Sequence, residues 1–371
     1  MTGIIQSGIT IVLFVLILGA LVVIHELGHF VTARLANVRV LEFGIGFPPR
    51  AKVLRAKGET LYTLNWLPIG GFVKLEGEDG NDADDPRSFS AQGLPKKLVI
   101  LVAGVAMNVI LAFAIFTLIA WVATPFVGVR FHEVQEGSPA AVAGLVPGDA
   151  IVAVDGQRYE FFGDENILDG LRGRAGQTIV LTIDHADRSR ADVPVSLRPP
   201  EEINDTQGAL GISSSADAPF EAYFSGEYTG RDLPSAVAIG VRETTGALGL
   251  ILGGLGALVG SFASDPTAAP PVAGPIGIAT QIGDIFWNAG PILTLYVAAI
   301  LSANLALVNI LPFPPLDGGR MLVITLKRIF GSRISLRAEQ LTYLVGFIFL
   351  FVFLIWVTGF DIIRSLGGAG S

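Results

Sequence analysis

The sequence contains no cysteine and only four histidines among its 371 residues. The lack of cysteine excludes disulfides, catalysis by a thiol and zinc sites built from thiolates. Charged residues are also scarce: they make up 16% of the chain, whereas 51% is hydrophobic. Soluble domains are about one quarter charged, so this deficit predicts long uncharged segments such as membrane spans. The net charge of −8 gives no support for a nucleic-acid partner.

Basic residues are distributed unevenly along the chain. None precedes Arg34, ten lie in 34–97 and five in 320–337, whereas the long stretch 127–290 has nine arginines, no lysine and 21 acidic residues. Positive charge marks the cytoplasmic loops of membrane proteins. The pattern therefore predicts that 34–97 and 313–340 lie inside the cell and that 127–290 lies outside.

Four apolar segments have about the 20 residues that a membrane span needs, at about 9–35, 98–126, 292–311 and 341–363. The first is interpreted as a span and not as a cleaved signal peptide, because no basic region precedes it. Between the first two, alternation over 61–66 and the glycines at 70–71 predict a small antiparallel sheet.

Residues 127–213 have the pattern of a soluble domain. A turn over 144–149 leads into a strand at 151–154, and further strands are expected at 178–184 and 193–197. The run GSPAAVAGLVPGDAIVAVDGQ at 137–157 resembles a PDZ domain. An unrelated small β domain is the alternative interpretation.

The first apolar segment contains His25-Glu26-Leu27-Gly28-His29, which has the pattern H-E-x-x-H. Residues four apart share one face of a helix, so both imidazoles are able to bind one metal ion while Glu26 polarises a metal-bound water. Ligation by two histidines without thiolates suits zinc. A helix that enters the membrane near Ile9 carries His25 roughly 24 Å in, at a depth where ionisable residues are usually functional. The alternative is a helix end in the polar interface.

A catalytic zinc site usually has three protein ligands. The other two histidines, His132 and His185, lie in the domain expected outside the cell, so the third ligand should be a carboxylate near a later span. Asp317 is the candidate, because it follows the third span on the cytoplasmic side. By spacing alone, Asp317 is equally well explained as the N-cap of a helix that begins near Arg320.

H-E-x-x-H in a first transmembrane helix, together with N-x-x-P-x-P-x-L-D-G at 309–318, resembles the signature pair of the site-2 protease family of intramembrane zinc metalloproteases. The runs GFVKLEGE (71–78) and GPIGIA (274–279) extend the resemblance over nearly the whole chain, and the inserted PDZ-like domain resembles the bacterial branch. The resemblance implies that His25, His29 and Asp317 bind Zn²⁺, that Glu26 is the general base and that Asn309 holds the substrate or the reacting carbonyl.

The uncharged run 246–263 is a borderline span with five glycines in 249–260. If it crossed the membrane, Asp317 would lie on the opposite side from the two histidines, so we expect a helix at the outer interface. The expected fold is a polytopic α-helical membrane protein with about four transmembrane helices, a small cytoplasmic membrane-associated β-sheet and an inserted extracytoplasmic PDZ-like α/β domain. Its expected parts are an N-terminal membrane region (1–126), the PDZ-like domain (127–213), a linker with the interfacial helix (214–290) and a C-terminal membrane region (291–371).

The expected function is hydrolysis of peptide bonds within or near transmembrane segments, as in regulated intramembrane proteolysis. Family resemblance implies anti-sigma factors or remnant signal peptides as substrate classes, the lipid bilayer as surroundings and the bacterial cell membrane as location, with the active site toward the cytoplasm. Two alternatives remain at this point: a membrane scaffold that binds partners through the PDZ-like domain, and a soluble secreted zinc protease. The substrate itself and the oligomeric state do not follow from the sequence.

Overall fold

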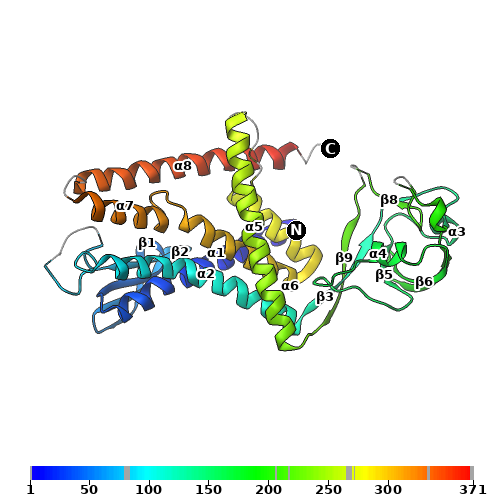
Figure 1. Cartoon of the computed structure of the whole chain (residues 1–371), viewed down its shortest axis with the longest axis horizontal. Helices are drawn as coiled ribbons and strands as arrows, with labels where there is room; N and C mark the ends of the chain where they lie inside the picture. The colour runs from blue at the N-terminus through cyan, green and yellow to red at the C-terminus, as the bar shows by residue number, and fades with distance from the viewer. Residues whose placement is uncertain are drawn as a thin grey trace. The chain divides into compact units, whose positions relative to one another are not determined.

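The computed structural model describes residues 2–78, 84–204, 207–215, 218–264, 270, 272–331 and 335–367. The chain forms two compact units (Figure 1). The larger contains Met1–Phe116, Gly240–Asn288 and Leu293–Ser371, and the smaller contains Thr117–Ile239 with Ala289–Ile292.

Helices dominate the larger unit. They are α1 (Thr2–Leu35), α2 (Leu94–Val122), α5 (Leu233–Ser264), α6 (Pro275–Ile310), α7 (Asp317–Phe330) and α8 (Leu336–Gly367). The last residues of α2 and the first residues of α5 belong to the smaller unit. Five of these, all except α7, are long and apolar enough to cross a membrane. Large apolar side chains stand exposed along them, for example Phe347 at 57% and Phe351 at 54% on α8. Exposed apolar surface on this scale is typical of contact with lipid.

A long helix covers all or most of each predicted span, and most of the bounds differ by several residues. Two of these differences have a visible structural cause. The second helix ends at Val122, four residues early, because Thr124 begins a strand. The third begins at Pro275, well before the predicted span, and is interrupted where Gly290 adopts a positive φ of 84° beside Pro291. The predicted span 292–311 corresponds to the part of α6 after this kink.

The run 246–263, expected at the outer interface, belongs to α5. By length and composition α5 is also a candidate span. Within the larger unit, α5 runs steeply across the direction of α7 and α8 (Figure 1). Ala247 packs against Phe116 of α2 and Ala299 and Ala303 of α6.

The antiparallel sheet predicted in 36–96 is present as β1 (Val40–Lys57) and β2 (Thr60–Leu75). Both strands are long and bent, so Glu42 of β1 pairs with Leu61 on one side and with Lys74 on the other. Residues 71–75 therefore form an outer edge, and among the described residues no further strand pairs with it. Leu75 and Val40 pack with Ala33 of α1 and Ile100 and Leu101 of α2, which holds the sheet against the helices.

The smaller unit is built on a five-stranded antiparallel sheet in the order β7-β6-β5-β3-β9. Its strands are β3 (Thr124–Arg130), β5 (Ala150–Val154), β6 (Thr178–Asp184), β7 (Arg190–Ser196) and β9 (Glu221–Thr229), with a short pair β4 (Glu133–Val134) and β8 (Ile212–Ser213) and the helices α3 (Pro139–Val142), α4 (Ile167–Arg172) and η1 (Pro200–Glu202). The three predicted strands correspond to β5, β6 and β7, and Asp155 and Gly156 have the positive φ of the predicted tight turn.

Residues 221–229, expected in a linker, instead form β9 beside β3, with Thr124 paired to Thr229. Phe131, Ile151, Leu181 and Ile183 are fully buried in the core of this unit. Because β3 and β9 are antiparallel neighbours, the start of β3 and the end of β9 lie side by side.

Candidate metal centre

His25 and His29 lie on one face of α1, as the spacing of four predicts, and both are buried. Gly28 between them packs against α2, where a Cβ atom would lie only 2.3 Å from the carbonyl oxygen of Ala103. The close approach of the two helices places the imidazoles at the helix interface and not on the outer surface of α1.

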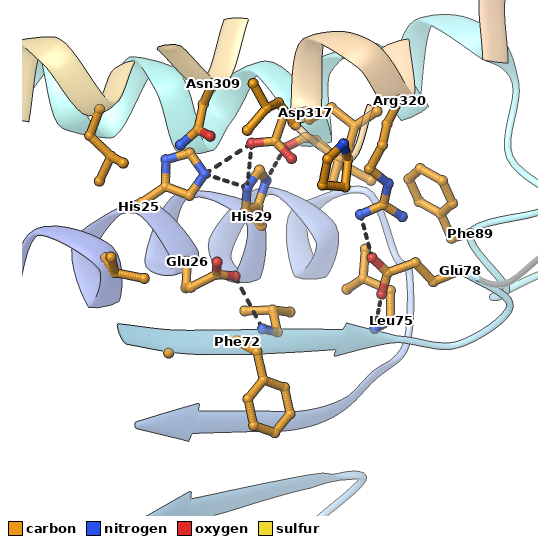
Figure 2. A pocket seen from close by; sticks show the side chains of 18 of the residues that line it. His25, Glu26, His29, Phe72, Leu75, Glu78, Phe89, Asn309, Asp317 and Arg320 are labelled. Carbon is orange, nitrogen blue, oxygen red and sulfur yellow. Dashed lines mark hydrogen bonds and ion pairs between the residues drawn. The ribbon is translucent and has the colours of Figure 1, made fainter. Parts of the chain in front are cut away.

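Asp317 begins α7 itself, and Leu316 is the N-cap of that helix. The capping interpretation of Asp317 is therefore wrong, because the helix begins three residues earlier than Arg320 and no side chain among the described residues caps it. Two glycines let this first turn pack closely. A Cβ on Gly318 would lie 2.1 Å from the carbonyl oxygen of Ile310 at the end of α6, and a Cβ on Gly319 would lie 2.3 Å from the backbone of Phe313 in the loop that follows. This packing leaves the carboxylate of Asp317 turned toward the two histidines (Figure 2).

Three potential ligand atoms form a nearly equilateral triangle. The Nε2 atoms of His25 and His29 are 3.2 Å apart, and Oδ2 of Asp317 lies 2.9 Å from the first and 3.2 Å from the second. A tetrahedral zinc ion with bonds of about 2.0–2.1 Å has ligand atoms roughly 3.4 Å apart. The residues thus fit a zinc ion, with three protein ligands and one remaining position.

Helix α2 contacts both imidazoles. Nδ1 of His29 lies 2.8 Å from the carbonyl oxygen of Ile100, and Nδ1 of His25 lies 3.3 Å from Nδ2 of Asn108. Between these two positions, Gly104 faces the rings so closely that a Cβ atom would lie 2.4 Å from Nε2 of His29. Ile100, Gly104 and Asn108 are spaced four residues apart and so lie on one face of α2. This face provides both the space for the two histidines and the groups that contact their rings.

Glu26 points toward the sheet edge formed by 71–75 (Figure 2). Its Oε2 accepts a hydrogen bond of 3.1 Å from the backbone N–H of Val73. Two residues further along the same edge, the N–H of Leu75 donates to Glu78, which also pairs with Arg320 of α7 at 2.6 Å. The edge strand is thereby tied both to the helix of the histidines and to the helix of Asp317.

All five predicted site residues line one cavity of about 370 Å³. They are His25, Glu26, His29, Asn309 and Asp317. Asn309 comes from the last turn of α6, and its side chain lies beside the His25 ring (Figure 2). Phe72, Val73 and Leu75 of the edge strand line the same cavity. An extended peptide chain would therefore meet the sheet edge and the potential ligand atoms together.

Sequence reasoning missed Gly104, Asn108 and the pair of Glu78 and Arg320. Asn108 could have been identified from the sequence, because an amide within an uncharged apolar span is energetically costly unless it is paired. Gly104 precedes it by one helical turn, on the same face. Arg320 follows Asp317 by three residues, which places both on one side of α7.

A model of peptidase family M50 matches residues 13–353. A protein of Clostridium acetobutylicum, whose designation as a zinc metalloprotease is itself a prediction, is 32% identical over 365 residues, or 97% of this chain and 99% of that protein. Zinc metalloprotease RasP of Geobacillus kaustophilus is 27% identical over 437 residues, covering 95% of this chain and 97% of the relative. A chloroplast protein of Arabidopsis thaliana, with the predicted designation of a membrane metalloprotease, is 31% identical over 87% of this chain and 73% of its own length.

Proposed function

Because the chain belongs to peptidase family M50, and is thus a membrane zinc metalloendopeptidase of the site-2 protease type, we propose that it cleaves peptide bonds within or near the transmembrane segments of other membrane proteins. One observation carries the proposal: His25, His29 and Asp317 gather within 4.8 Å of one another from helices that are far apart in sequence. We assign these three residues as the zinc ligands.

A bound zinc ion supplies Lewis acidity, which polarises the scissile carbonyl and makes water a better nucleophile near neutral pH. Glu26 is the general base that accepts the proton of the attacking water, since it follows His25 directly and lines the same cavity. The side chain of Asn309 lies beside the His25 ring, and its amide N–H would stabilise the carbonyl oxygen of the substrate as that oxygen gains negative charge.

The edge of residues 71–75 is the proposed binding surface for the unwound substrate. A transmembrane helix hides its backbone in its own hydrogen bonds, so it must extend before hydrolysis. Pairing with an exposed strand edge offsets the hydrogen bonds that are lost. The cavity position of Phe72, Val73 and Leu75 supports this role, because a strand added there would pass the histidines.

The proposed topology has four spans: α1, α2, the part of α6 after its kink, and α8. The basic residues of 34–97 and 320–337 then lie on the cytoplasmic side together with the metal ligands. In this arrangement α5 lies along the outer interface, and its course across α7 and α8 supports that placement. A single crossing of the membrane by α5 would place Asp317 on the opposite side from the two histidines, whereas α5 at the interface keeps all three residues on one side.

The smaller unit is proposed to be an extracytoplasmic PDZ-like domain. Its support is the run at 137–157, its short α-helices around an antiparallel sheet and the scarcity of basic residues in 127–290. The proposed location is a bacterial cell membrane, with anti-sigma factors or remnant signal peptides as the candidate substrate classes.

Zinc content and cleavage, measured separately on the purified full chain, test the assignment. Wild-type protein should hold about one zinc ion. His25→Ala, His29→Ala and Asp317→Ala should each lower zinc occupancy, whereas Glu26→Gln should retain zinc and abolish cleavage of a transmembrane reporter. Full zinc and full cleavage in Asp317→Ala would overturn the ligand set, and normal cleavage by Glu26→Gln would overturn the role of the base.

A further inference from the structure

Asn108 is a fully buried amide in the middle of the apolar helix α2. Its Nδ2 lies 3.3 Å from Nδ1 of His25, while its Oδ1 is buried without a hydrogen-bond partner in the part of the chain that the structure describes. A buried amide oxygen without a partner is destabilising, so its presence beside a proposed metal ligand indicates a functional role.

The chemistry of the His25 imidazole indicates what the function of the Asn108 amide is. A neutral histidine carries its hydrogen on one ring nitrogen only. If His25 binds a metal through Nε2, the hydrogen must lie on Nδ1, and that N–H needs an acceptor. His29 has such an acceptor in the carbonyl oxygen of Ile100, 2.8 Å from its Nδ1. At His25 the group in the equivalent place is the Asn108 amide.

A half-turn of the Asn108 amide about its Cβ–Cγ bond exchanges Nδ2 and Oδ1. This rotation pairs the unsatisfied oxygen with the Nδ1–H of His25, and it leaves Nε2 with its lone pair toward Asp317 and His29. We infer that Asn108 is a positioning residue that holds His25 in the tautomer and orientation required of a zinc ligand; the inference rests on the ligand assignment proposed above.

The surroundings of Asn108 fix its position. The hydroxyl of Ser302 on α6 donates a 2.8 Å hydrogen bond to the backbone carbonyl of Asn108. Gly104, one turn earlier, leaves room for both imidazoles. Helix α6 also carries Asn309 and leads to Asp317. The contact with Ser302 therefore joins Asn108 to the helix that brings these two residues to the site.

Zinc affinity of the purified full chain, measured by competition with a chromophoric chelator, tests the inference alongside cleavage of the reporter. Asn108→Leu keeps the branching at Cγ but removes the acceptor, and it should weaken zinc binding by roughly 10- to 100-fold. Asn108→Asp keeps an acceptor oxygen and should bind zinc at least as tightly as wild type. Ile110→Ala is the control: it shortens an exposed side chain of the same helix, and zinc affinity should stay within about threefold of wild type.

Unchanged zinc affinity in Asn108→Leu would overturn the inference, as would equal losses in Asn108→Leu and Asn108→Asp, which would show a packing role. His25→Ala separates this failure from failure of the proposed function. If His25→Ala binds zinc as tightly as wild type, the ligand assignment itself is wrong. If His25→Ala loses zinc while Asn108→Leu does not, the ligands stand and only the role of Asn108 falls.

Discussion

The backbone N–H of Val73 donates a hydrogen bond to Oε2 of Glu26 over 3.1 Å. The residue proposed as the general base is therefore held by the strand edge that is proposed to bind the substrate. A substrate carbonyl that pairs with Val73 would compete for this N–H and release the Glu26 carboxylate at the moment when the scissile bond arrives.

The N–H of Val73 should thus matter more than its side chain. Val73→Pro removes the donor, and edge strands tolerate proline best, whereas Val73→Ala keeps the donor and loses only methyl groups. A hydrogen bond to a charged group contributes about 1.5–3 kcal/mol, so cleavage by Val73→Pro should fall roughly 10- to 100-fold with zinc retained. Val73→Ala should stay within about threefold. Equal activities of the two variants would show that this N–H has no part in the reaction.

Gly104 should be intolerant of any side chain. In Gly104→Ala the new Cβ would lie 2.4 Å from Nε2 of His29 and 2.8 Å from Cε1 of His25, so both rings must shift. Zinc affinity should fall roughly 10- to 100-fold, as for loss of an orienting group. Gly8→Ala on α1 is the control, because nothing lies within 4 Å of the new atom; helix propensity predicts a neutral or slightly stabilising effect. Wild-type zinc affinity in Gly104→Ala would contradict the observed packing.

The four-span topology predicts which introduced cysteines an impermeant reagent reaches in intact cells. The chain has no cysteine, so each label reports one site. Cysteines replacing the exposed residues Lys52 and Arg328 should be protected, and one replacing the exposed Ser189 should react. Reaction at Arg328→Cys together with protection at Lys52→Cys would show that α5 crosses the membrane.

Excision of the smaller unit tests whether it restricts substrate access. Thr124 and Thr229 are paired neighbours on β3 and β9, roughly 5 Å apart, so a short glycine-serine linker replaces 125–228 with little strain. If the unit excludes bulky outer domains, the excised protein should cleave a substrate with an intact outer domain faster, and a trimmed substrate at the same rate. Equal slowing of both substrates, with zinc retained, would indicate a structural role.

Local patterns in the sequence were enough to predict much of this protein. Uncharged apolar length predicted the long helices, alternation with glycine breaks predicted the sheet of β1 and β2, and the spacing of four placed His25 and His29 on one face. These predictions hold because periodicity and hydrophobic length depend on neighbouring residues alone. Spacing alone left Asp317 undecided between a ligand and an N-cap, and the family resemblance was needed to prefer the ligand.

Tertiary structure decided the remainder, because it depends on contacts between distant segments. Asp317 meets His25 across 292 positions of the chain. This approach depends on the two glycines after Asp317, which pack against the end of α6 and against the loop that follows it. The contacts of Val73 with Glu26 and of Asn108 with His25 likewise join separate elements, and no local pattern encodes them. The sequence by itself determined which residues were chemically able to bind zinc; the packing of α1, α2 and α7 determined which of them come within bonding distance of one point.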